Sequence, residues 1–121
     1  MDSVQEALDA SGNVIGYLIT SSSTEGYGGS IQIAVGITNE GTLTGIGFLS
    51  ISETAGLGMN AQNPEFKDQY AGKAAQEFEV TKTGATADNQ INAISGATIT
   101  SRAVTGAVNA AVYFYENCIA Q

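Results

Sequence analysis

The chain has 121 residues, of which 43% are hydrophobic and only 13% are charged, and its formal net charge is −8. This length and apolar content predict one compact domain rather than a disordered segment. Twelve acidic residues against four basic ones argue against nucleic-acid binding and against an anionic membrane surface as a partner. With no histidine and one cysteine, the chain cannot form a Ser-His-Asp triad, a His-ligated haem site, a Cys/His zinc site or an internal disulfide.

The first half of the chain predicts an antiparallel sheet. Residues 30–37 alternate between apolar and other side chains, which is typical of a strand with one buried face. Asn39-Glu40-Gly41 is a turn signal directly after this strand, and Ser11-Gly12-Asn13 is another before the strand expected at 14–20. The elements expected here are a weak strand at 4–10, strands at 14–20, 30–37 and 43–51, and a polar loop at 21–29.

The second half predicts two helices. Asn63-Pro64-Glu65 combines a capping side chain, a proline and an acidic residue, so a helix is expected from there to about Tyr70, ending at Gly72. Residues 78–80 are expected to form a short strand, and 83–92 a polar segment rich in turns. From 102 to 118 apolar residues recur at intervals of three and four, which predicts a long helix. The expected fold class is therefore α+β, an antiparallel meander with one long C-terminal helix and one shorter helix packed on it.

The segment before the long helix contains the residues most suggestive of a binding site. Thr100 or Ser101 is expected to be the N-cap, and the first helical amides and the helix dipole favour an anion nearby. Arg102 adds a cation, while Gly96 and Ala97 are small enough for a ligand to approach the backbone. From these residues alone, a simple helix cap and an anion site are both open interpretations.

Three elements of the sequence resemble the FMN-binding domain family, which includes the G subunit of the Rnf electron-transport complex and the C subunit of the sodium-pumping NADH:quinone reductase. Ser95-Gly96-Ala97-Thr98 is similar to the flavinylation motif of that family. Glu53-Thr54-Ala55-Gly56-Leu57-Gly58 resembles its Glu-Thr-Pro-Gly-Leu-Gly loop, and Gly26-Tyr27-Gly28-Gly29 resembles its opening segment. The three elements occur in the family's order, and the resemblance extends over residues 12–118.

The resemblance implies that FMN is bound covalently, through a phosphoester to Thr98 that a separate flavin transferase forms. It also implies that the loop at 53–58 packs against the flavin ring. Tyr27 is expected either to stack near the ring or to close the edge of the core. Lys82 is either a basic neighbour of the cofactor or a solvated surface charge. The residues expected to bind the cofactor are Thr98, Ser95, Gly96, Ala97, Thr100, Glu53, Thr54, Leu57, Gly58, Tyr27 and Lys82.

Two positions depart from the family's pattern. Ala55 stands where the family usually has proline, so the loop is expected to be less rigid. Asn92 stands where the motif usually has aspartate, six residues before Thr98. A flavin transferase that reads this position would meet an amide in place of a carboxylate.

The function expected from the resemblance is electron relay by an FMN domain inside a membrane-bound ion-translocating oxidoreductase complex. Its partners would be other subunits of the complex and the flavin transferase. NADH is not expected to bind directly, because the chain lacks a dinucleotide glycine fingerprint. Residues 1–121 are expected to form a single domain without an N-terminal membrane anchor, at the outer face of the cytoplasmic membrane. The alternatives are a non-catalytic extracytoplasmic binding module and a flavin-dependent reductase with its own substrate.

Overall fold

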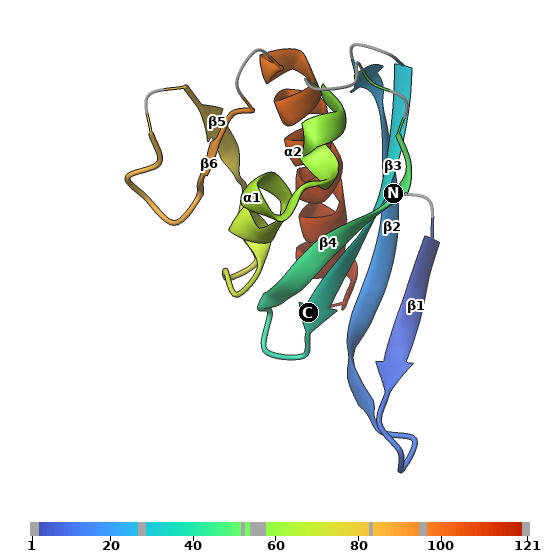
Figure 1. The fold of residues 1–121 in the computed structure, drawn as a ribbon. Coiled ribbons are helices and arrows are strands. Elements are labelled where there is room, and N and C mark those ends of the chain that lie inside the picture. The colour runs from blue at the N-terminus through green and yellow to red at the C-terminus, as the bar shows by residue number, and fades with distance from the viewer. Residues whose placement is uncertain are drawn as a thin grey trace.

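The computed structural model describes residues 3–26, 29–51, 53, 58–82, 84–94 and 97–119. A four-stranded antiparallel sheet has its strands in chain order, which confirms the predicted meander. Its strands are β1 (Ser3–Leu8), β2 (Val14–Gly26), β3 (Gly29–Thr38) and β4 (Leu43–Ser50). The long helix α2 (Thr98–Phe114) lies along one face of this sheet (Figure 1). The predicted α+β fold class is therefore confirmed.

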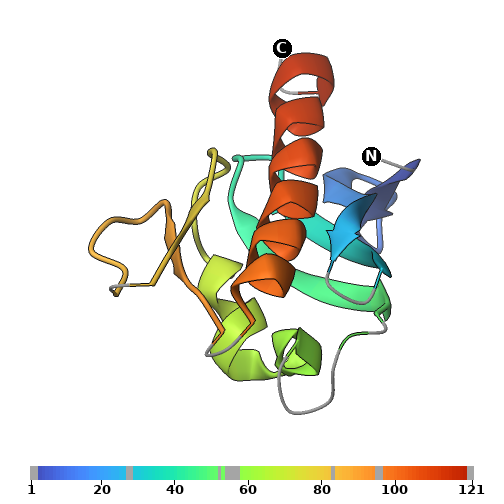
Figure 2. The same cartoon turned by 90° about the horizontal axis from the view of Figure 1, so that it is seen from above.

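Smaller elements complete the fold around α2. Figure 2 shows the short helices below α2 and the strands β5 and β6 on the side of α2 away from β1. These two strands pair in parallel, with Val80 opposite Ile91. The smaller elements are the 3₁₀ turn η1 (Gly58–Gln62), α1 (Pro64–Lys67), the 3₁₀ turn η2 (Asp68–Tyr70), β5 (Glu79–Thr81), β6 (Gln90–Asn92) and the π-helical turn η3 (Tyr115–Ile119). The predicted shorter helix thus has the expected extent, but it is divided between α1 and η2.

The main core lies between the sheet and α2. Along β3 every second side chain is buried, as its alternating sequence predicts, and Val35 pairs with Ile19 on β2 and Ile46 on β4. The buried residues of α2 recur with the helical period, so the helix presents one continuous apolar face to the strands. Each such aliphatic side chain contributes roughly 1.5–3 kcal/mol by leaving water. The buried residues on the two surfaces include Ile31, Ile33, Val35, Ile37, Val104, Ala107, Val108, Ala111 and Val112.

A second group of aromatic side chains connects α1, η2 and the segment before β5 to α2. The Tyr70 ring meets those of Phe66 and Phe78 edge to face, with centroids 6.0 and 5.4 Å away. The Tyr70 hydroxyl and the Thr105 Oγ1 of α2 form a buried 2.7 Å hydrogen bond. Burial raises the pKa of Tyr70 well above its ordinary value, because a phenolate would lose its hydration there.

The predicted polar loop at 21–29 is wrong over most of its length. β2 continues to Gly26 and β3 begins at Gly29, so the two strands pair far beyond the apolar part of the sequence. Ser21 pairs with Ile33 and Ser23 with Ile31, and Ser21 is completely buried. Pairing with an apolar partner strand therefore overrides the polar composition of this stretch. Strand β6 within the predicted turn-rich segment at 83–92 is a second difference.

Candidate functional site

The long helix begins four residues earlier than its apolar pattern predicts, so the start predicted at Arg102 is wrong. Thr98 is its first residue, and the N-cap is Ala97, which offers no capping side chain. The first turn contains no acidic residue. The first backbone N–H groups of α2 therefore lack helical partners and lie at the positive end of the helix dipole.

The hydroxyl of Ser101 fastens the chain before the helix to the first helical turn. It accepts a hydrogen bond from the Ile94 N–H at 2.9 Å and donates one to the Ala97 carbonyl at 2.9 Å. Ser101 is completely buried inside the helix, so its expected role as N-cap is wrong. The alternative N-cap, Thr100, is wrong for the same reason, because it is the third residue of the helix.

Thr100 joins the helix to the segment at 53–58. Its hydroxyl donates to the Glu53 Oε1 at 2.6 Å, and Thr100 itself is 1% exposed. Gly58 packs closely against this pair and leaves no room for a side chain, because a Cβ at that position would lie 2.6 Å from both the Glu53 Cβ and the Thr100 Oγ1. The structure thus brings together three residues that the sequence assigned to one site, although they lie up to 47 positions apart.

Thr98 differs from the other hydroxyl residues of the first turn. Its side chain is partly exposed, and within the described part of the chain its hydroxyl makes no hydrogen bond. Thr100 and Ser101 are buried, and both hydroxyls are occupied. Arg102 follows at once and is exposed. Among the described residues, Thr98 is therefore the hydroxyl-bearing residue of this turn whose side chain is partly exposed, and Arg102 lies one helical turn further along.

Some of the predicted site residues cannot be placed. Tyr27, Thr54, Leu57, Ser95 and Gly96 lie outside the described residues. Of the others, Ala97 is buried at the start of the helix, which agrees with its small size. Lys82 is exposed directly after β5, so a role for it beside a cofactor stays a prediction.

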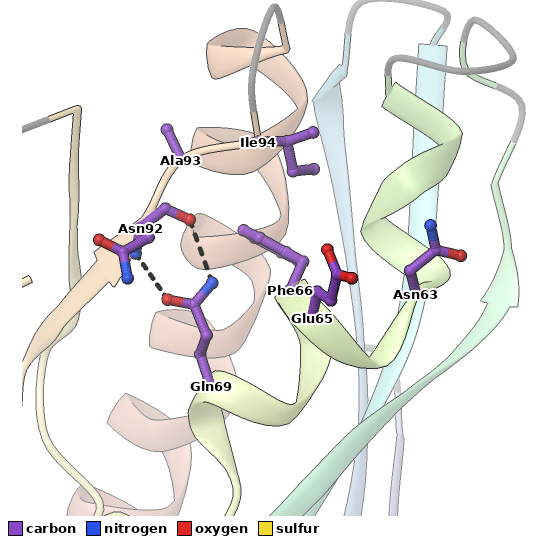
Figure 3. A pocket seen from close by; sticks show the side chains of 7 residues that line it. All are labelled: Asn63, Glu65, Phe66, Gln69, Asn92, Ala93 and Ile94. Carbon is purple, nitrogen blue, oxygen red and sulfur yellow. Dashed lines mark hydrogen bonds between the residues drawn. The ribbon is translucent and has the colours of Figure 1, made fainter. Parts of the chain in front are cut away.

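An open cavity of about 250 Å³ lies between α1 and the chain leading to α2. Figure 3 shows the side chains that line it and the Gln69 side chain bound to Asn92. Gln69 Oε1 accepts the Asn92 N–H at 2.7 Å, and Gln69 Nε2 donates to the Asn92 carbonyl at 3.1 Å. Sequence reasoning missed Gln69, because its partner lies 23 residues away and no local pattern marks the contact. The cavity is lined by Asn63, Glu65, Phe66, Gln69, Asn92, Ala93 and Ile94.

The side chain of Asn92 has a structural partner of its own. Its Oδ1 accepts the Ala85 N–H at 2.7 Å and closes the loop before β6. An aspartate would offer the same acceptor oxygen. The departure from the family's usual aspartate therefore leaves this contact in place.

The described residues give no sign of a metal site or of a membrane span. Nowhere among them do three or more His, Cys, Asp or Glu side chains gather closely enough to hold a metal ion. None of the helices in this part of the chain has the length and apolar character needed to cross a bilayer.

Known proteins share both the sequence pattern and the fold. Residues 26–113 match the family model described as the FMN-binding domain. The G subunit of the Na(+)-translocating ferredoxin:NAD(+) oxidoreductase complex of Acetobacterium woodii is 42% identical over 110 residues, which cover 89% of this chain and 53% of that protein. The G subunit of the ion-translocating oxidoreductase complex of Methanosarcina acetivorans is 40% identical over 108 residues, which cover 88% of this chain and 55% of that protein. The chain thus spans about half the length of these relatives.

Solved structures of NqrC proteins have the same fold. The crystal structure of Shewanella oneidensis NqrC aligns with a TM-score of 0.72 at 23% identity, over 88% of this chain and 52% of that one. The C subunit of the Na(+)-translocating NADH-quinone reductase from Parabacteroides distasonis aligns with a TM-score of 0.70 at 24% identity, over 84% of this chain and 55% of that one. The family match covers strands β3 and β4, residues 53–58 and almost all of α2, so the chain belongs to the FMN-binding domain family.

Proposed function

We propose that this chain is an electron-transfer domain that carries FMN through a phosphoester to Thr98, within a membrane-bound ion-translocating oxidoreductase complex. The observation that carries the proposal is the Thr98 side chain, which is partly exposed and whose hydroxyl has no hydrogen-bond partner among the described residues. It lies on the first turn of a 17-residue helix, in the position that matches the acceptor of the family's motif.

The described residues fit a phosphate at this place. The first turn of α2 has no side-chain cap and no acid of its own, so its amides and dipole are available to an anion. Arg102 supplies a nearby positive charge. The Glu53 carboxylate is already at the helix terminus through Thr100, where the dipole also stabilises it. A phosphate on Thr98 would be the second anion there, which gives Arg102 a role in balancing the charge.

The chain's own residues would tether and orient the cofactor, and FMN when bound supplies the reversible uptake of electrons. Thr98 provides the point of attachment. The Glu53–Thr100 hydrogen bond and the close approach of Gly58 hold Glu53 and Gly58 against the start of α2. This arrangement would keep these two residues of the predicted flavin-binding loop near the helix turn that carries the attachment point.

The partners follow from the relatives. The G subunits of Acetobacterium woodii and Methanosarcina acetivorans are named as parts of ion-translocating oxidoreductase complexes. By analogy, the protein containing this chain would exchange electrons with other subunits of such a complex, at the outer face of the cytoplasmic membrane. A flavin transferase would attach the cofactor, and NADH would not bind to this domain.

Mass spectrometry of the intact protein tests the attachment directly. The wild-type chain is coexpressed with a flavin transferase, alongside Thr98→Ala, Thr98→Ser and the control Thr44→Ala, which changes an exposed threonine of β4. Wild type, Thr98→Ser and Thr44→Ala should gain the mass of FMN less one water, whereas Thr98→Ala should not. A wild-type chain that stays unmodified, or a Thr98→Ala chain that is modified, would refute the proposal.

A further inference from the structure

Two side-chain amides bind the two ends of residues 78–92, the excursion that carries β5 and β6. At one end Gln69 binds both backbone groups of Asn92, at 2.7 and 3.1 Å. At the other end Asn109 binds both backbone groups of Phe78 in the same way, at 2.8 and 2.9 Å. Each side-chain amide accepts the N–H and donates to the carbonyl of one residue, as the backbone of a neighbouring strand would. The two contacts are chemically matched, but they lie at different distances along the chain from Thr98.

The Gln69 contact lies at the start of residues 92–98, the acceptor segment, which ends at the proposed attachment point Thr98. Asn92 is six residues before Thr98. Between them, the Ile94 N–H is held by Ser101, whose hydroxyl also binds the Ala97 carbonyl. Gln69 thus holds the backbone of Asn92, and Ser101 holds the backbones of Ile94 and Ala97. The Asn109 contact lies at the far end of the excursion and controls no residue between Asn92 and Thr98.

We propose that Gln69 is a positioning residue for the modification of Thr98. By binding Asn92, it keeps the acceptor segment in the conformation that the flavin transferase engages, and this inference rests on the proposed function. The modification forms a bond between the Thr98 Oγ and the phosphorus of the flavin nucleotide. The bond from that phosphorus to the leaving nucleotide of a flavin dinucleotide breaks, and the hydroxyl proton leaves with the released nucleotide.

The energetic basis is a local equilibrium. Transfer is fast only from the conformation in which the acceptor is presented, so the rate follows the population of that conformation. Loss of the two Gln69 hydrogen bonds removes local stabilisation that corresponds to about a tenfold change in the population of the open segment. A change of the same size at Phe78 would loosen the excursion without opening the acceptor segment.

The experiment compares Gln69→Leu with the matched control Asn109→Leu, since each replaces the amide side chain that binds the backbone by the same apolar side chain. Purified chains are incubated with a flavin transferase and flavin adenine dinucleotide, and kcat/KM for the chain as acceptor is followed by intact mass. Hydrogen exchange of the Asn92 amide and urea unfolding are measured on the same samples. Gln69→Leu should lower kcat/KM about tenfold and speed exchange at Asn92, whereas Asn109→Leu should leave both within about twofold.

Gln69→Glu is the second variant, in case Gln69→Leu does not fold. It keeps an acceptor for the Asn92 N–H but loses the donor to the carbonyl, so its kcat/KM should lie between those of wild type and Gln69→Leu. Wild-type kcat/KM in both Gln69 variants would overturn the inference, as would an equal loss in Asn109→Leu. A wild-type chain that is never modified would instead refute the proposed function.

Discussion

Gly58→Ala is the substitution that most directly perturbs the contact between α2 and the segment at 53–58. The added Cβ would lie 2.6 Å from the Glu53 Cβ and 2.6 Å from the Thr100 Oγ1. Comfortable contacts between carbon atoms are about 3.5–4.0 Å, so the shortfall is about 1 Å. Thr100 is buried on the helix and the Glu53 Cβ is adjacent to the backbone. The strain therefore has to separate the segment from the helix.

The expected cost has two parts. Overpacking of this kind costs about 1–3 kcal/mol, and separation also weakens the charge-assisted hydrogen bond from Thr100 to Glu53, worth about 1.5–3 kcal/mol. We therefore expect Gly58→Ala to lower the free energy of unfolding by roughly 2–5 kcal/mol. Gly106→Ala is the matched control, because nothing lies within 4 Å of the added Cβ on this exposed part of α2. It should raise the free energy of unfolding by about 0.5–1 kcal/mol.

Urea unfolding followed by circular dichroism measures both variants against wild type. The double variant Gly58→Ala/Thr100→Ala should lose less stability than the sum of its single variants, since Thr100→Ala removes one of the two colliding atoms. A Gly58→Ala chain as stable as wild type, or strict additivity in the double variant, would show that the close approach of Gly58 does not hold this contact.

Two further predictions concern buried hydroxyl groups. Tyr70→Phe should lose about 1–2 kcal/mol of stability at neutral pH, because it leaves Thr105 without its partner. The pKa of Tyr70 is raised in the folded protein, so its contribution is fully present below the unfolded value of 10.0 and declines above it, by about 1.4 kcal/mol per pH unit. Urea titrations at several alkaline pH values should show this extra slope in wild type but not in Tyr70→Phe, and identical slopes would contradict the assignment. Ser21→Ala should raise the melting temperature slightly, because the buried Ser21 Oγ has no hydrogen-bond partner among the described residues; a fall of more than a few degrees would count against this.

The fold could be predicted where burial follows a local period. The alternation along Ile31–Ile37 and the helical spacing from Val104 to Val112 each identify a buried face within one short segment, and the structure buries both faces as expected. The loop predicted at 21–29 failed because its serines and threonines are compatible with a strand. Only the partner strand, in which Ile33 pairs with Ser21 and Ile31 with Ser23, decides that they form a strand.

The site could be predicted only as far as its motif is contiguous. The motif that ends at Thr98 is found by sequence, but the cap was assigned to Thr100 or Ser101 because both residue types commonly cap helices. Their hydroxyls are instead used by Glu53, 47 positions away, and by Ile94. Gln69 had no signal at all. Such contacts depend on how distant segments are brought together, which no local pattern records.

This use of hydroxyls also explains why one residue of the first turn would be modified and not its neighbours. Thr98, Thr100 and Ser101 have the same functional group within four positions. A transferase needs an exposed oxygen with a free lone pair and room for a phosphoryl group beside it. Thr100 is 1% exposed and donates to Glu53, while Ser101 is fully buried with two partners. Under the proposed function, selectivity for Thr98 would therefore follow from the packing of this domain, before any recognition of sequence by the transferase.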